Sequence, residues 1–187
     1  MDMQGKSWHA ALPCPSRDKL VLLTVPFVDF DGDKTTGQLI VAKAHASNIM
    51  AALDAAVASG ILRIERMELV DKYGGDDDAS MAANNTSAFN CRYISGTKTL
   101  SAHALGIAID INPLFNPLVR HGDEGTAVEP QKGRYDPTRP GTLTRSNTEE
   151  YLRPLGWSWG GRWPKPADYQ HIEKSRGRCA HLQFSLK

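Results

Sequence analysis

Residues 101–111 constrain the fold of this 187-residue chain more than any other segment. From position 106 onward, every second residue is an isoleucine, and alternate side chains of a strand point to opposite faces. The isoleucines, with Ile109 at their centre, would therefore face the core. The opposite face would carry Gly106, Ala108 and Asp110. Such a strand leaves room for another group to lie against it, with one carboxylate as the polar contact.

His103 is expected to enter the same space from the turn before this strand. Imidazole nitrogens and carboxylate oxygens are ordinary zinc ligands, and a catalytic site takes about three ligands from protein and leaves a position for water. His103 and Asp110 therefore predict part of a metal site. The competing interpretation is that Asp110 caps a turn and His103 lies at the surface.

A third ligand would come from a distant part of the chain, and His171 is the leading candidate. Asp168 precedes it by three residues, and both follow the tryptophan-rich segment 157–163. A carboxylate at that spacing can reach the water on a metal without occupying the metal itself, as a general base must. The other candidates are His9, His45, His121 and His181, with His181 in reserve.

The apolar pattern predicts an α+β fold with several short strands. Residues 20–30 and 38–42 are expected to form a hairpin, and apolar residues at helical spacing predict a helix from Ser47 to Gly60. Further strands are predicted at residues 65–70, 90–94, 106–111, 171–173 and 180–184.

The remaining segments are predicted to be loops or short helical turns. Residues 73–88 are predicted to be an ordered loop. Residues 113–145 contain five prolines and no apolar period, and they form either a lid over the site or a surface loop. Ser146 and Glu149 match a capping box, which predicts a short helix through Leu152.

Length and composition indicate one domain. An apolar fraction of 41% and a charged fraction of 23% suffice for a sizeable core without help from a metal. Residues 1–19 hold prolines and no apolar period, and they are expected to be a loose N-terminal arm. Residues 20–187 would then form a single catalytic domain.

Charge and cysteine content exclude several classes of protein. The net charge of +1 gives no overall attraction to nucleic acid or to an anionic membrane. No stretch is long enough to span a membrane, and no signal peptide is visible. Cys14, Cys91 and Cys179 contain no C-x-x-C pair, and they fit one disulfide with a free thiol or three buried thiols. The oligomeric state is left open.

Two motifs together point to a family. Residues 101–110 match every specified position of S-x-H-x-x-G-x-A-x-D, and residues 168–171 match D/E-x-x-H. From about Val25 onward, the chain resembles the D-Ala-D-Ala carboxypeptidase/L-alanyl-D-glutamate endopeptidase family of zinc peptidases, in its endolysin-like branch. The resemblance implies an α+β fold of the Hedgehog and D-Ala-D-Ala peptidase type, a small antiparallel sheet with flanking helices.

The resemblance also implies roles for individual residues. His103, Asp110 and His171 would hold Zn²⁺, and Asp168 would be the catalytic base. Arg92 lies where the family places an arginine that binds substrate and stabilises the developing oxyanion. Zinc would activate a water and polarise the scissile carbonyl.

Ser101 occupies the first motif position and is expected to hydrogen-bond substrate or a ligand. The chain departs from the family at Ile172, where phenylalanine is common, and it lacks a recognisable wall-binding module.

The activity implied by the resemblance is hydrolysis of peptidoglycan stem peptides in the cell wall. The endolysin-like segments favour an L-alanyl-D-glutamate endopeptidase. The alternatives are a D-alanyl-D-alanine carboxypeptidase, a peptidase for free dipeptides and a non-catalytic zinc-containing wall-binding domain.

Overall fold

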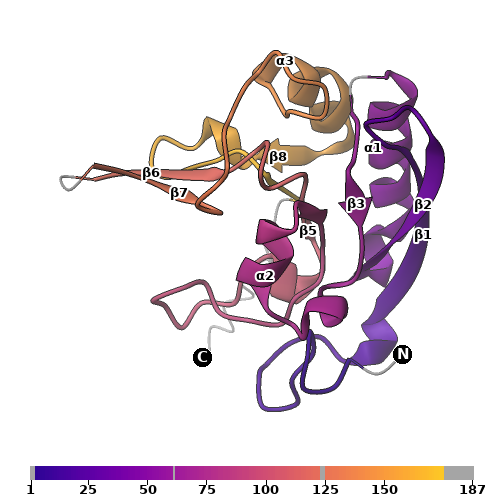
Figure 1. Cartoon of the computed structure of the whole chain (residues 1–187). Helices are drawn as coiled ribbons and strands as arrows, with labels where there is room; N and C mark the ends of the chain where they lie inside the picture. The colour runs from indigo at the N-terminus through magenta and orange to yellow at the C-terminus, as the bar shows by residue number, and fades with distance from the viewer. Residues whose placement is uncertain (1–2, 61, 123–124, 175–187) are drawn as a thin grey trace, which may run out of the picture.

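The computed structural model describes residues 3–60, 62–122 and 125–174. It combines small sheets with few helices, which confirms the predicted α+β class (Figure 1). The strands are β1 (Leu20–Val28), β2 (Lys34–Ala42), β3 (Arg66–Met67), β4 (Asn85–Thr86), β5 (Ala108–Asp110), β6 (Leu118–Gly122), β7 (Gly125–Glu129), β8 (Trp157–Trp159), β9 (Ala167–Asp168) and β10 (His171–Lys174).

The helices are short apart from the first. The α-helices are α1 (Ala46–Ala58), α2 (Asp77–Ala82) and α3 (Arg145–Asn147). A π-helical turn follows α3 at Thr148–Leu152. Turns of 3₁₀ helix lie at Arg17–Lys19, Lys43–His45, Val70–Tyr73, His103–Leu105, Arg153–Leu155 and Gly160–Arg162.

The predicted hairpin and the predicted first helix are both confirmed. Strands β1 and β2 pair antiparallel along their whole length, from Leu20 opposite Ala42 to Val28 opposite Lys34. The Asp29 carboxylate closes the turn between them by accepting two backbone N–H bonds. Helix α1 packs along this hairpin on one side of the molecule (Figure 1).

The main core lies between α1, the hairpin and the sheet that contains β5. Its fully buried members come from elements far apart in sequence, because each contributes one apolar face. They include Val25, Leu39, Val41, Ile49, Leu53, Ile64, Ile109, Ile111 and Ile172.

Strand β10 is the centre of a three-stranded antiparallel sheet in the order β5-β10-β8. On one side Ile172 pairs with Ile109, and His171 pairs with Asp110. On the other side Ile172 pairs with Trp159. This register buries the isoleucine of β10 in the core and places His171 beside Asp110, although the two are 61 positions apart in the chain.

The prediction of a long loop at residues 113–145 is wrong in its first half. Strands β6 and β7 form an antiparallel hairpin there, and β9 pairs with the other edge of β6. The hairpin projects away from α1 and the main core (Figure 1). Its outer half is exposed, so no buried apolar alternation marks it in the sequence.

Two local predictions also need correction. Residues 73–88 contain α2, because Asp76 caps that helix by accepting from the Ala79 N–H. The capping box lies two residues earlier than predicted: the Thr144 hydroxyl accepts from the Asn147 N–H, and the Asn147 side chain accepts from the Thr144 N–H. Residues 90–94 are irregular rather than a strand, with one bridge at their end.

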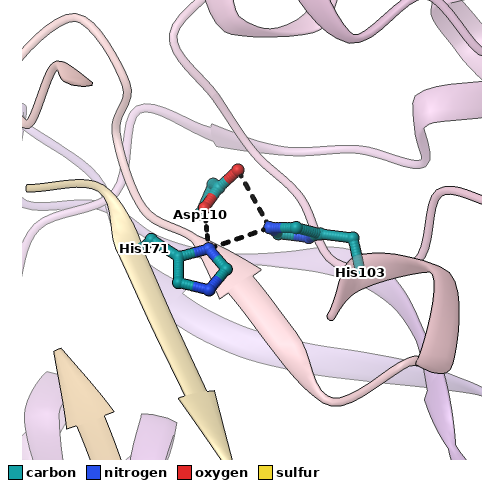
Figure 2. A group of neighbouring side chains, drawn as sticks. All are labelled: His103, Asp110 and His171. Carbon is teal, nitrogen blue, oxygen red and sulfur yellow. Dashed lines mark hydrogen bonds and ion pairs between the residues drawn. The ribbon is translucent and has the colours of Figure 1, made fainter. Parts of the chain in front are cut away.

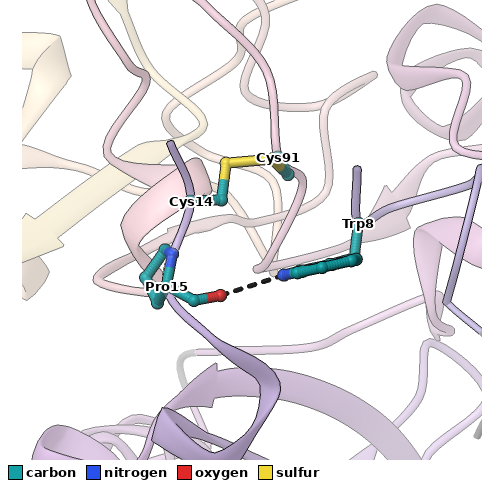
Figure 3. The surroundings of a disulfide bond; sticks show 4 residues. All are labelled: Trp8, Cys14, Pro15 and Cys91. Carbon is teal, nitrogen blue, oxygen red and sulfur yellow. Dashed lines mark hydrogen bonds between the residues drawn. A yellow bond between two sulfur atoms is a disulfide. The ribbon is translucent and has the colours of Figure 1, made fainter. Parts of the chain in front are cut away.

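The N-terminal segment is not loose, although the division of the chain into an arm and a domain stays a prediction. Cys14 forms a disulfide with Cys91 (Figure 3). The Cys91 N–H donates to the Ser7 carbonyl over 2.8 Å, and the Ser7 hydroxyl donates to Asp71 over 2.7 Å. Met3 is buried in a second small core with Ile40, Phe89 and Cys91. A crosslink and side-chain burial therefore hold a segment that lacks any sequence periodicity.

Within the part of the chain that the structure describes, no helix has the length and apolar character needed to cross a membrane. The strand predicted at residues 180–184, the reserve ligand His181 and Cys179 lie outside the described residues.

Candidate metal centre

Three side chains from two distant segments of the chain converge at the edge of the β5-β10 pair. The donor atoms of His103, Asp110 and His171 all lie within 4.8 Å of one another, and all three residues are buried. His103 Nε2 is 3.1 Å from His171 Nδ1 and 3.2 Å from Asp110 Oδ2, and His171 Nδ1 is 3.1 Å from Asp110 Oδ1. Figure 2 shows the three groups pointing toward one another. This cluster, called the triad below, could bind a metal ion.

The sheet and the turn before it build the triad. Asp110 and His171 are opposite each other in the β5-β10 register. His103 comes from the 3₁₀ turn His103–Leu105, which ends at Gly106 with a φ of +69°. A Cβ at Gly106 would lie 2.5 Å from the Ala42 backbone nitrogen, so a glycine is required for this turn to dock on the end of β2.

Both imidazoles are held through the nitrogen that points away from the triad. His103 Nδ1 lies 2.6 Å from the Ala88 carbonyl oxygen, which can only accept, so this nitrogen carries a proton. His171 Nε2 lies 3.3 Å from a Glu173 carboxylate oxygen. With those protons fixed outside, His103 Nε2 and His171 Nδ1 are the nitrogens that face inward, as metal-binding histidines require.

Electrostatics matches this arrangement. Burial disfavours charge on Asp110, but the charges and hydrogen bonds of His103 and His171 hold the pKa of that carboxyl well below its usual range. Burial also opposes charge on His171, yet its hydrogen bonds to Asp110 and Glu173 raise the pKa of the imidazole to about 10. A cation at the triad would compete with protons for the same nitrogen and oxygen atoms.

Asp168 lies close enough to the triad to respond to its charges. Burial raises the pKa of Asp168 to about 6, and the negative charge of Asp110 acts in the same direction. Its Oδ1 atom is buried and has no hydrogen-bond partner among the described residues. A buried carboxylate oxygen without a hydrogen bond, next to three side chains that can bind a metal, fits a site for a cation and its water.

Two neighbouring elements fix Asp168 in place. Strand β9 pairs with β6, which sets Asp168 opposite Leu118. A Cβ at Gly160 would lie 2.6 Å from the Asp168 carbonyl oxygen, so the turn after β8 packs directly on this residue. Trp163 is 38% exposed, and the centroid of its ring lies 5.4 Å from that of the His171 ring. The tryptophan-rich segment therefore lines the site on one side.

Arg92 and Ser101 lie on neighbouring backbone but differ in their side-chain contacts. The Ser101 N–H donates to the Arg92 carbonyl, and the buried Ser101 hydroxyl accepts from the His103 N–H over 3.2 Å. The Arg92 guanidinium pairs with the Asp77 carboxylate at 2.5 Å, and its Nε has no partner among the described residues. Ser101 thus supports the His103 turn, while Arg92 is held by helix α2.

The other candidate histidines that the structure describes are not part of the triad. His121 lies on β6 and contacts Thr126, His45 lies directly before α1, and His9 belongs to the N-terminal segment. Sequence reasoning missed Asp77 and Glu173. Glu173 carried a usable signal, because a residue two positions from His171 on the same strand shares its face. Asp77 carried none, since its partner is 15 positions away across irregular backbone.

Comparison with protein families supports the resemblance seen in the two motifs. A family model described as D-alanyl-D-alanine carboxypeptidase matches residues 95–174. The matched segment contains the triad and Asp168, and it starts three residues after Arg92. It supports a hydrolase of the carboxypeptidase type. The comparisons with curated proteins and with solved structures gave no match.

Proposed function

We propose that this chain is a zinc-dependent peptidase that hydrolyses peptidoglycan stem peptides, with the Hedgehog and D-Ala-D-Ala peptidase type of fold. The observation that carries the proposal is the triad itself. Two imidazoles and a carboxylate converge with their inward atoms about 3 Å apart, and both imidazoles are anchored from outside. Asp168 lies beside them with a raised pKa.

The donor set favours zinc over other common cations. Two imidazole nitrogens with one carboxylate oxygen suit Zn²⁺, whereas magnesium and calcium prefer all-oxygen sites. His103, Asp110 and His171 would hold the ion. When bound, zinc would act as a Lewis acid that polarises the scissile carbonyl and makes a water more acidic.

Asp168 would be the general base. A carboxyl whose pKa is raised to about 6 is ionised near neutral pH and still binds a proton readily, which suits proton transfer at that pH. Its Oδ1 atom, which has no partner among the described residues, would accept the proton of the attacking water. The same carboxyl would then deliver that proton to the leaving amine as the C–N bond breaks.

Arg92 and Ser101 would act on the substrate side. The Arg92 guanidinium would pair with a substrate carboxylate or with negative charge that develops on the carbonyl oxygen. It now pairs with Asp77, so substrate would share or displace that contact. The Ser101 hydroxyl would bind substrate or keep the His103 turn in place.

The bond that is cut has two leading candidates. The endolysin-like segments favour the L-alanyl-D-glutamate bond, which makes an endopeptidase the first proposal. The description of the matching family model favours removal of a terminal D-alanine, which makes a carboxypeptidase the second. A wall-binding domain without turnover needs neither Asp168 nor Arg92, and both are present. In all three cases the site of action would be the cell wall.

One digestion experiment separates these proposals. Zinc-loaded protein is incubated with purified peptidoglycan, and the products are identified by mass spectrometry, with a chelator-treated sample as control. New peptides that begin with D-glutamate are expected. Release of D-alanine alone would replace the endopeptidase with the carboxypeptidase. Binding to the wall without any cleavage, by protein that carries its metal, would overturn the peptidase proposal.

A further inference from the structure

Glu173 is in a position to control His171, and the reason lies in the geometry of β10. Residues two apart on a strand point to the same face, so Glu173 and His171 lie side by side. Glu173 Oε2 is 3.3 Å from His171 Nε2. The imidazole is 9% exposed and the carboxylate 26%, so solvent screens their interaction only in part.

An imidazole can bind a cation through either nitrogen, and the nitrogen that carries the proton decides which. Glu173 accepts a hydrogen bond, so it keeps the proton on Nε2 and leaves the lone pair of Nδ1 for the triad. His103 is held in the opposite sense, because the Ala88 carbonyl keeps the proton on Nδ1. The two histidines therefore present different nitrogens, each selected by its own acceptor.

These two acceptors differ in kind. The Ala88 acceptor is a backbone oxygen in a buried segment, which no side-chain substitution removes. Glu173 supplies a charged side chain from a backbone fixed on both sides, opposite Ala108 and Ser158. The Ser158 hydroxyl also donates to the Glu173 carbonyl oxygen. The strand thus fixes the backbone position of Glu173, and the Glu173 carboxylate orients the His171 ring.

We propose that Glu173 is a positioning residue that sets the tautomer and orientation of His171 and thereby raises the affinity of the triad for its cation. The inference rests on the proposed metal site and not on which bond is cleaved. The negative charge of Glu173 would also strengthen the His171 imidazole as a ligand, as carboxylate partners of metal-bound histidines do.

The test measures metal affinity by competition with a chromophoric chelator, which needs no catalysis. Glu173→Ala is expected to lower the Zn²⁺ affinity about 10- to 100-fold, the usual effect of losing such a partner. Glu173→Gln keeps an acceptor oxygen without the charge, so it should lose less than about 10-fold. Ser158→Ala is the matched control, since it removes a hydrogen bond to the same backbone and leaves the carboxylate; wild-type affinity is expected.

A second measurement does not depend on any variant folding. Nitrogen-15 NMR of the zinc-loaded wild type should show His171 with its proton on Nε2 and its metal on Nδ1, and His103 in the reverse arrangement. Metal on Nε2 of His171, or an unchanged affinity in Glu173→Ala, would overturn the proposal. Failure of the metal site itself is recognised separately, because wild type and His171→Ala would then bind zinc equally poorly. Failure of the peptidase proposal leaves these affinities unaffected.

Discussion

The two sides of the candidate site are built in different ways. On the proposed metal side, Asp110 and His171 face each other across paired strands, and both histidines have a partner for each nitrogen. On the proposed substrate side, Arg92 lies on irregular backbone next to the Cys14–Cys91 disulfide (Figure 3), and the Asp77 carboxylate holds its guanidinium. The Arg92 side chain is 34% exposed, whereas the triad is almost completely buried.

This difference makes the triad the rigid side of the site and Arg92 the adaptable side. Strand pairing fixes Asp110 and His171, and the docked turn fixes His103, so the geometry of the triad should be the same before and after substrate binds. An ion pair with Asp77 holds the Arg92 guanidinium, and a partly exposed ion pair rearranges at low cost. A hydrolase needs its metal donors preorganised, but a substrate-binding arginine can exchange one carboxylate for another.

The largest expected effect tests the rigid side. His171→Ala should lose the bound metal and reduce hydrolysis of stem peptides by roughly 1,000-fold or more, because the Lewis acid and one third of its ligands disappear together. Metal content by mass spectrometry and peptide turnover are measured on the same sample. His121→Ala is the control, since that histidine lies on β6 outside the triad. A variant at position 171 with full metal content would show that the triad is not the metal site.

Asp168→Asn should separate chemistry from metal binding. It is expected to keep its zinc and to lose hydrolysis by about 100- to 10,000-fold, since the general base is replaced by a group that cannot accept a proton. In the wild type, kcat/KM should fall as the pH drops through about 6 or below, because the pKa of Asp168 is raised to about 6 and a bound cation lowers it. Loss of zinc from the variant would show that Asp168 is a metal ligand and not the general base.

The same residue has a stability signature in the metal-free protein. The pKa of Asp168 rises from 3.8 to about 6 on folding, so the native state binds more protons than the unfolded state between those pH values. Ionisation of Asp168 therefore lowers the free energy of unfolding as the pH rises through this window, by up to about 3 kcal/mol above it. Metal-free Asp168→Asn should unfold at a higher denaturant concentration than wild type at pH 7.5, with the difference vanishing near pH 4.

Substitutions on the adaptable side should have smaller effects. Arg92→Ala is expected to keep its zinc and to lower kcat/KM by about 10- to 1,000-fold, with Arg92→Lys in between, since lysine keeps the charge but not the paired donors. Asp77→Asn should lower KM, because it removes the carboxylate that competes with substrate for Arg92. Unchanged kinetics in both Arg92 variants would exclude a role in substrate binding.

The smallest effect on catalysis is expected from removing the Cys14–Cys91 disulfide. Cys14→Ser opens a disulfide that spans 77 positions, which should lower the free energy of unfolding by about 2–5 kcal/mol. Zinc affinity should stay at the wild-type value because the crosslink does not touch the triad, while KM rises a few-fold through greater freedom at Arg92. Denaturant unfolding and chelator competition measure the two quantities. A large loss of zinc would show that the two sides are not independent.

The sequence was sufficient where local spacing carries the information. The β1–β2 hairpin, α1 and strand β5, which covers the middle of the predicted range 106–111, each have an apolar period that burial enforces. His103 and Asp110 lie within one short segment, and His171 was found through its spacing from Asp168. These predictions depend on residues close together in the chain.

What the sequence did not reveal depends either on partners far apart in the chain or on exposed residues that leave no apolar period. The exposed β6–β7 hairpin buries too little to leave a period, although β6 supports Asp168 through β9. The Cys14–Cys91 pairing depends on how an aperiodic segment packs against the domain. The Arg92–Asp77 pair joins irregular backbone to a helix that polar composition concealed.

Gly106 shows that a sequence motif can record two independent demands. Its positive φ and its contact with the Ala42 backbone are requirements of assembly, since any side chain would push the turn off the hairpin. Nothing about that requirement involves hydrolysis. A related chain with another residue at position 103 would still need this glycine to fold. The glycine of the motif can therefore persist in a chain that has lost the proposed metal site. Only the metal-binding positions would indicate whether such a chain can still bind the metal.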